Sequence, residues 1–292
     1  MEQFLRQLQT IPEAAELIRR VDGGGCPAAV TGLQPVQRAC VGAAVAAACG
    51  RPAVFLCGDE REVQVLSADL ETLTGKRPVT LLGREWQFRP GAVGSRDWER
   101  SRLAALYALA QGDAPVVVAT ADVLMARTLP PETLRSLAIT LEVGGQAELG
   151  ALAEQLLSAG YTRCEQVEGV GQFALRGGIL DVFSPLMDQP VRCEFFDDEI
   201  DSMGAFAPGT QRRTRNVSSA RILPAAEVLP HCAPGGLPGL ADQLTALAEK
   251  LAKKQKTEAI VQTLREDAER LRSGAAPGAA DRYLAAIYPT VT

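Results

Sequence analysis

The order of apolar segments restricts the fold of this chain more than any other feature of its sequence. Three short apolar runs lie in the first half, separated by segments with helical spacing: residues 53–57, 79–82 and 115–119. Continuous apolar strands that alternate with helices are typical of a parallel sheet covered on both faces. We therefore expect residues 1–145 to form an α/β domain with a parallel sheet, of the nucleotide-hydrolase type.

Apolar side chains at helical spacing predict the helices of this domain. One helix should occupy residues 1–20 and end at the glycines Gly23–Gly25. A short apolar run at Ala28–Val30 predicts a strand, which a turn joins to an Ala-rich helix that ends near Ala48. Two further helices are expected, at residues 59–73 and 100–111.

The pattern changes near Gly144-Gly145. A helical segment at residues 147–159 is followed, as far as about Leu223, by short strands separated by turn residues. The connections are too short for crossover helices, so we expect a small α+β domain with an antiparallel sheet. The predicted organisation is an α/β domain interrupted by an inserted domain, with three parts: residues 1–145, 146–222 and 223–292.

The returning part of the chain is highly charged. We expect one helix from about Leu240 to Arg272. Its first leucines are spaced as in a heptad, but Lys254 and Glu258 occupy the next positions of the seam. This pattern favours a solvated helix that packs along one stripe over a coiled coil.

Composition argues against several classes of function. Asp and Glu outnumber Lys and Arg by 35 to 30, a net charge of −5, whereas autonomous nucleic-acid binding needs clustered basic side chains. The one histidine, His231, lies in a Pro- and Gly-rich loop, which leaves little room for His-based catalysis or a multi-His metal centre. The seven cysteines show no C-x-x-C spacing, so we expect buried free thiols.

The start of the chain is charged and amphipathic, unlike a signal peptide. Arg51-Pro52 interrupts the most apolar stretch, so we expect no membrane span and a cytoplasmic location.

The loop before the Ala-rich helix stands where a P-loop would bind phosphate. That motif requires G-x-x-x-x-G-K-S/T, because glycines expose the backbone N–H groups, Lys neutralises the phosphates and the hydroxyl holds Mg²⁺. Residues 32–39 instead read GLQPVQRA, which lacks the second glycine, the lysine and the hydroxyl. We expect a degenerate P-loop, no ATP hydrolysis, and neither cofactor nor metal in this chain. A divergent nucleotide-binding enzyme that uses Arg38 is the alternative.

Two charged clusters have ordinary explanations. Asp197-Asp198-Glu199 falls at the tip of an expected hairpin, where acidic residues suit the turn. Four arginines form a small basic patch that is either solvated surface or a contact for nucleic acid or an acidic partner: Arg212, Arg213, Arg215 and Arg221.

Alternation along the strands of residues 171–206 selects a candidate interface. Successive side chains of a strand point to opposite faces. If the apolar sets pack inward, Arg176, Arg192 and Phe196 all point to solvent. Arginine and aromatic residues dominate the energetics of protein interfaces, so the three residues are candidates for binding a protein partner. The alternative, that another part of the protein covers them, stays open.

The same region resembles a known family. Residues 176–183, RGGILDVF, and residues 192–202, with EFFDDEIDS, closely resemble the UvrB-like module shared by UvrB and the bacterial transcription-repair coupling factors (Mfd). Further matches are found in four short segments: residues 101–107, 159–161, 210–212 and 223–227. UvrB keeps a working phosphate cradle and the coupling factors have lost it, so the loop at residues 32–39 favours an N-terminal fragment of a coupling factor.

This resemblance implies a role in recruitment. In the family, the inserted domain binds the repair protein UvrA and brings it to lesions where RNA polymerase has stalled; by motif, that contact falls on Arg176, Arg192 and Phe196. The parent would be an ATP-dependent DNA translocase whose downstream domains contact RNA polymerase and DNA and use ATP and Mg²⁺, while this chain itself would not be catalytic. Alternatives are a damaged-DNA-binding module like UvrB, or a scaffold whose binding face is masked.

Overall fold

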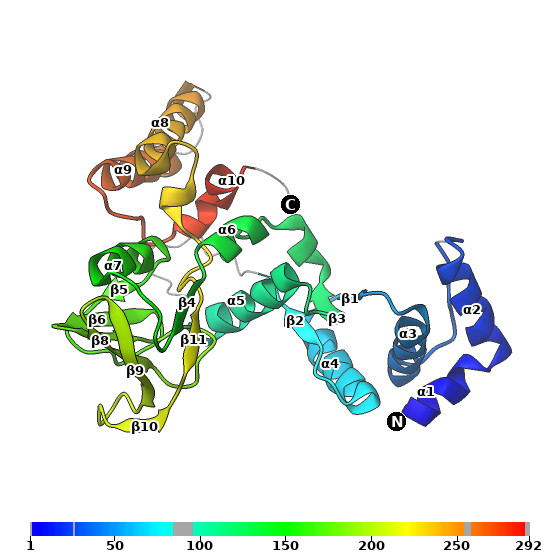
Figure 1. The fold of residues 1–292 in the computed structure, drawn as a ribbon. Helices are drawn as coiled ribbons and strands as arrows, with labels where there is room; N and C mark the ends of the chain where they lie inside the picture. The colour runs from blue at the N-terminus through cyan, green and yellow to red at the C-terminus, as the bar shows by residue number, and fades with distance from the viewer. Residues whose placement is uncertain (1, 26, 84–95, 254–257, 290–292) are drawn as a thin grey trace. The chain divides into compact units, whose positions relative to one another are not determined.

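The computed structural model describes residues 2–25, 27–83, 96–253 and 258–289 (Figure 1). The chain is divided into two compact units. The N-terminal unit comprises Met1–Arg84 and Ala108–Ala126, and the C-terminal unit comprises Glu85–Tyr107 and Arg127–Thr292. The division falls within helix α5 (Arg96–Gln111). The three-part organisation drawn from the sequence stays a prediction.

A parallel sheet forms the centre of the N-terminal unit. Its strands β1 (Ala53–Cys57), β3 (Val116–Thr120) and β2 (Val79–Leu81) lie in the order β1-β3-β2. Helices α1 (Glu2–Gln9), α3 (Pro35–Cys49) and α4 (Glu60–Thr74) contribute Leu5, Ala43 and Leu70 to one core with Val118 of β3. The expected parallel sheet with helices is therefore confirmed, but its expected cover on both faces is not, because Val54 and Leu56 of β1 are exposed.

Two expected elements of this unit are wrong. Residues 1–20 form two helices, α1 and α2 (Pro12–Asp22), because Pro12 lacks an N–H group and is accepted at the first position of a new helix. The run Ala28–Val30 forms no strand: Val30 is 51% exposed, and alanine has low strand propensity.

The C-terminal unit contains a six-stranded sheet with the order β10-β9-β8-β7-β6-β5 (Figure 1). All neighbouring strands pair antiparallel except β5 and β6, so the expected antiparallel sheet is confirmed apart from this edge pair. A separate antiparallel pair joins β4 (Ile139–Glu142) and β11 (Ser219–Ile222). The six strands are β5 (Thr162–Arg163), β6 (Gln172–Arg176), β7 (Ile179–Val182), β8 (Val191–Phe196), β9 (Glu199–Phe206) and β10 (Arg213–Asn216).

One face of the six-stranded sheet, the inner face, packs on the main core of this unit. Helix α7 (Leu149–Ser158) supplies Leu152 and Leu156, and the sheet supplies residues such as Phe173 and Cys193. Burial raises the pKa of the Cys193 thiol to about 12, so this side chain stays uncharged inside the core. The opposite face, the outer face, carries polar side chains, among them Arg176, Asp181 and Arg192.

The charged segment after the sheet is a helical hairpin rather than one helix. Helix α8 (Gly236–Lys253) buries Leu240 and Leu244, and α9 (Glu258–Arg272) buries Val261 and Leu264. The two helices lie side by side (Figure 1), and Arg272 Nη2 at the end of α9 donates to Thr245 Oγ1 of α8 at 2.8 Å. The chain reverses because two apolar stripes bury more surface against each other than one solvated helix can. Lys254 and Lys256 of the expected helix lie outside the described residues, as does Cys26.

Short helices complete the fold. In the N-terminal unit a 3₁₀ turn η1 (Ala121–Met125) follows β3. The C-terminal unit adds α6 (Pro131–Ser136), η2 (Pro230–Cys232), η3 (Ala280–Tyr283) and α10 (Leu284–Ile287).

A buried ion pair joins distant segments of the C-terminal unit. Arg102 of α5 donates from Nε to Glu227 Oε2 at 2.6 Å and from Nη2 to Oε1 at 3.0 Å. Both side chains are almost fully buried, and the Tyr288 hydroxyl near the end of the chain donates to the Glu227 carbonyl at 2.8 Å. Three segments far apart in the sequence therefore meet at Glu227.

We expect Glu227→Ala to lower the free energy of unfolding by about 3–5 kcal/mol, because the substitution removes both charge-assisted hydrogen bonds between a buried carboxylate and the buried Arg102 guanidinium. Urea denaturation followed by circular dichroism measures the loss. Glu16→Ala is the matched control: Glu16 pairs with Arg20 on an exposed helix surface, so its loss should stay below about 1 kcal/mol. Equal losses in the two variants would contradict the structural role of the buried pair.

Candidate protein interface

The outer face of the six-stranded sheet is built around a tight hairpin. Strands β6 and β7 are joined by Gly177-Gly178, with Arg176 opposite Ile179. Gly177 has φ of 59°, a left-handed conformation that costs glycine little, so the strands reverse within two residues. The hairpin places Arg176 and Asp181 on the same face of the sheet.

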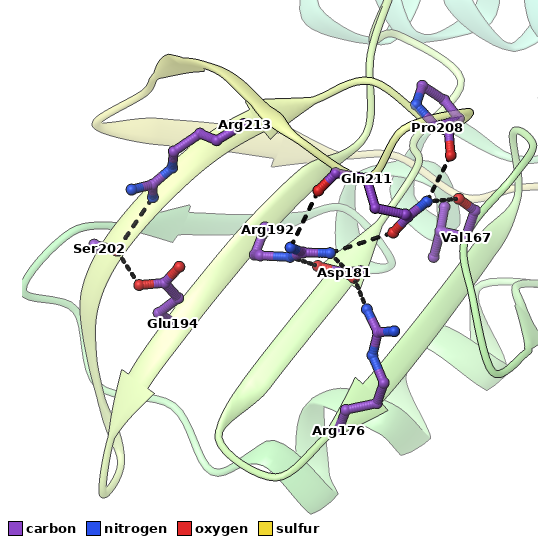
Figure 2. A network of polar contacts seen from close by, with 9 residues as sticks. All are labelled: Val167, Arg176, Asp181, Arg192, Glu194, Ser202, Pro208, Gln211 and Arg213. Atoms are coloured by element: carbon purple, nitrogen blue, oxygen red, sulfur yellow. Dashed lines mark hydrogen bonds and ion pairs between the residues drawn. The ribbon is translucent and has the colours of Figure 1, made fainter.

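Asp181 is a buried carboxylate held by two arginines (Figure 2). Arg192 of β8 donates from Nε to Oδ1 at 2.7 Å and from Nη2 to Oδ2 at 2.8 Å. Arg176 of β6 donates from Nη2 to the same Oδ2 at 2.7 Å. A buried carboxylate needs such partners, because otherwise no hydrogen bond or opposite charge would replace the hydration that it loses on burial.

Gln211 completes the network from the loop before β10 (Figure 2). Its carbonyl and Oε1 accept from Arg192 at 3.5 and 3.3 Å, and its Nε2 donates to the carbonyls of Pro208 and Val167 at 2.7 and 3.2 Å. Gln211 has φ of 56°, which is uncommon for a residue other than glycine and persists only where surrounding contacts fix it.

The Arg192 guanidinium is held by other side chains of the sheet and is largely covered. Its guanidinium also lies over the Phe206 ring, with 4.7 Å from Cζ to the ring centroid. The hydrogen bonds with Asp181 raise the pKa of Arg192 above its ordinary value. Only 22% of the Arg192 side chain is exposed, against 48% for Arg176.

Phe196 presents an apolar ring to solvent at the end of β8. It is 76% exposed, while its neighbour Phe195 packs against the core of the inner face. Because Phe196 has the parity of Arg192 along the strand, it belongs to the outer face, roughly 13 Å further along at the rise of a β-strand. The ring stands beside the arginine cluster rather than inside it.

A second polar row crosses the outer face between these sites. Arg213 Nη2 of β10 donates to Ser202 Oγ at 3.1 Å, and Ser202 Oγ donates to Glu194 Oε2 at 2.9 Å (Figure 2). A Cβ on Gly204 would come within 1.9 Å of Arg213 Nε, so only glycine lets the arginine lie flat across the strand. The outer face therefore presents ordered charges in addition to Phe196.

The three residues selected from the sequence share the outer face, but to different degrees. Phe196 and Arg176 are accessible, whereas Arg192 is largely covered by its own sheet. Their role in binding a partner stays a prediction. Sequence reasoning missed Asp181 and Gln211; a charged residue inside the apolar strand ILDV was a signal, because it requires a buried partner.

Residues 32–39 comprise a short loop and the first residues of α3, and their polar groups bond within the segment and to Glu62. Gln34 and Gln37 form a reciprocal cap at the start of α3, and Pro35 takes the first helical position. Arg38 Nε donates to the Leu33 carbonyl at 3.3 Å, and Arg38 Nη1 lies 3.8 Å from Glu62 Oε1. Whether this loop is a degenerate P-loop stays a prediction.

The remaining candidates from the sequence do not form a second site among the described residues. Asp197 and Asp198 form the expected turn between β8 and β9, and Asp197 adopts φ of 53°. Arg221, one of the four basic-patch residues, donates to Thr140 Oγ1 at 2.8 Å and lies over the Tyr107 ring. Burial lowers the pKa of His231, whose Nε2 lies 3.4 Å from Cys232 Sγ.

The six described cysteines are free thiols, of which Cys57 and Cys193 are buried and the others partly exposed. Within the described ranges, no three His, Cys, Asp or Glu side chains come together as metal ligands would. The absence of a cofactor from this chain stays an expectation. In the same ranges, none of the helices has the length and apolar character needed to span a membrane.

Comparison with known proteins places this face in a defined domain family. Residues 139–227 match the family model described as the UvrB interaction domain. The chain is also similar to transcription-repair coupling factors: that of Myxococcus xanthus is 34% identical over 253 residues, 83% of this chain and 20% of the relative. That of Bacillus subtilis (strain 168) is 30% identical over 263 residues, 89% of this chain and 22% of the relative. That of Escherichia coli (strain K12) is 33% identical over 178 residues, 60% of this chain and 15% of the relative.

The segment that matches the UvrB interaction domain, residues 139–227, thus contains the six-stranded sheet and its outer face. The chain is related to the transcription-repair coupling factors, and the resemblance read from the RGGILDVF and EFFDDEID segments is confirmed. The chain spans about one fifth of the length of the first two of these relatives.

We expect Asp181→Ala to lower the free energy of unfolding by about 2 kcal/mol, less than loss of a fully buried pair, because Arg176 and Arg192 can still reach water. Urea denaturation of the whole chain measures it. Asp198→Ala removes the same charge from the exposed hairpin tip and should change stability by less than about 0.5 kcal/mol. If Asp181→Ala left the free energy of unfolding unchanged, the proposed contribution of this carboxylate to the stability of the sheet would be contradicted.

Proposed function

We propose that this chain is a non-catalytic UvrB-homology module that recruits the excision-repair protein UvrA through the outer face of residues 139–227. The observation that carries the proposal is Phe196, an aromatic ring 76% exposed beside an ordered arginine cluster, inside a domain of the UvrB interaction family. Exposed aromatic and arginine side chains are the usual anchors of protein interfaces.

Similarity to the coupling factors supports the wider setting of this role. We propose that the chain is an N-terminal part of such a factor and acts where RNA polymerase has stalled at DNA lesions. The parent would then be an ATP-dependent DNA translocase, which contacts RNA polymerase and DNA and uses ATP and Mg²⁺ through regions other than this chain. Such a role belongs in the cytoplasm, where these partners are found.

The loop at residues 32–39 supports a module without ATPase activity. P-loop enzymes surround phosphate with free backbone N–H groups and a lysine. Here the Gln34 side chain accepts from the backbone at the start of α3, Pro35 has no N–H group, and Arg38 is engaged by Leu33 and Glu62. We propose that the loop is a degenerate P-loop that keeps the fold of the N-terminal unit rather than a reaction site.

We expect Phe196→Ala and Arg176→Glu each to weaken binding of purified UvrA by at least about tenfold, the scale of an interface anchor. Titration calorimetry with the whole chain measures the affinities. The matched controls lie on the exposed surface of α9: Ile260→Ala for the apolar change and Arg265→Glu for the charge reversal. Both should bind like the wild type, and wild-type affinity in both test variants would reject the proposed interface.

We expect purified chain to hydrolyse ATP no faster than the buffer blank, because the groups that stabilise a transferring phosphoryl are missing. Phosphate release measures the rate. Turnover that disappears in Arg38→Ala would instead support a divergent nucleotide-binding enzyme.

A further inference from the structure

The two arginines of the outer face bind the same carboxylate but differ in how many of their N–H donors remain available to a partner. Arg192 uses Nε, Nη1 and Nη2 within the sheet, on Asp181 and Gln211. Among the described residues, Arg176 donates from Nη2 alone, to Asp181. The Nε and Nη1 groups of Arg176 therefore stay available, and nearly half of its side chain is exposed.

The hydrogen bonds form a chain that ends at Arg176. Gln211 is fixed by two loop carbonyls and accepts from Arg192. Arg192 binds both oxygens of Asp181 in a forked arrangement, which sets the plane of the carboxylate. Asp181 Oδ2 then accepts from Arg176 at 2.7 Å, so the orientation of the last guanidinium follows from residues that are themselves buried or covered.

We propose that Asp181 is a positioning residue: held by Arg192 and Gln211, it fixes the Arg176 guanidinium so that its remaining donors bind a carboxylate on the partner. The inference rests on the proposed function of the outer face and names the chemistry of its partner, an acidic surface. An arginine held in advance loses less side-chain entropy on binding than a free one, which strengthens the contact.

This arrangement explains why an anion-binding site would contain a carboxylate of its own. Asp181 carries one negative charge against two guanidinium groups, so the cluster keeps a net charge of about +1. Because Asp181 is buried and both its oxygens are occupied, it is a hydrogen-bond acceptor for the arginines rather than a repulsive charge facing the partner. Positive charge remains at the surface, on Arg176.

A double-mutant cycle on UvrA binding tests the inference. In the wild-type background, Arg176→Ala should weaken affinity about tenfold, as expected for a charge-assisted hydrogen bond. In the Asp181→Asn background, which removes the charge and keeps the shape, the same substitution should cost less than about threefold. A residue with a purely structural role would lower stability but leave the cost of Arg176→Ala unchanged.

Asp198→Asn provides the matched control, because it makes the same charge change on the exposed tip of the β8–β9 hairpin. In that background Arg176→Ala should keep its full effect. If Asp181→Asn does not fold by circular dichroism, Arg192→Lys replaces it: lysine keeps the charge but cannot bind both oxygens of Asp181, so the cost of Arg176→Ala should fall in the same way.

The outcomes separate the two proposals. No binding of UvrA by the wild-type chain rejects the proposed function itself. Binding with an Arg176→Ala cost that is equal or larger in the Asp181→Asn background rejects only the positioning role. The positioning role is supported if Arg176→Ala weakens binding less in the Asp181→Asn background than in the wild type. Binding by the Arg176→Ala variant should also depend less on salt than wild-type binding, because a contact between a guanidinium and a partner carboxylate has been lost.

Discussion

A charge removed from water must be paired, and this constraint organises the C-terminal unit. Two of its buried carboxylates, Glu227 and Asp181, are each paired with arginines from other segments. Glu227 draws α5 and the end of the chain together, while Asp181 draws together β6, β8 and the loop before β10. The apolar core supplies most of the stabilisation, but these pairs decide which segments meet, because a carboxylate without its arginine would be costly.

The two faces of the six-stranded sheet have consequently separate roles. The inner face is closed by α7 and by apolar side chains, which makes the sheet a rigid support. The outer face combines a small apolar cluster around Phe206 with hydrogen-bonded arginines and an exposed ring at Phe196. Side chains held on strands are better ordered than side chains on loops, so this face suits recognition that depends on fixed geometry.

Residue patterns predicted the sheet and its faces well, and the reason is visible in β8. An extra residue, Asp201, interrupts the pairing of β8 and β9 but lies on β9, so the alternation from Val191 to Phe196 is undisturbed. The predictions failed where the spacing of apolar residues identified the type of element correctly but could not show which distant segment it packs against. Leucine spacing in the charged segment is helical, yet nothing local indicated that α8 and α9 would pack on each other.

The sequence by itself determined the elements: periods of two and of about 3.6 residues, turn glycines such as Gly177, and Pro12 as a helix start all act within a few residues. The family motifs in residues 176–202 were also recognisable from the sequence alone. Only the tertiary structure decided that Arg192 is covered while Arg176 is open, because their difference depends on Asp181 and Gln211, which lie up to 35 positions from Arg176. Pairing across such separations follows from packing and charge compensation in three dimensions, which no local pattern encodes.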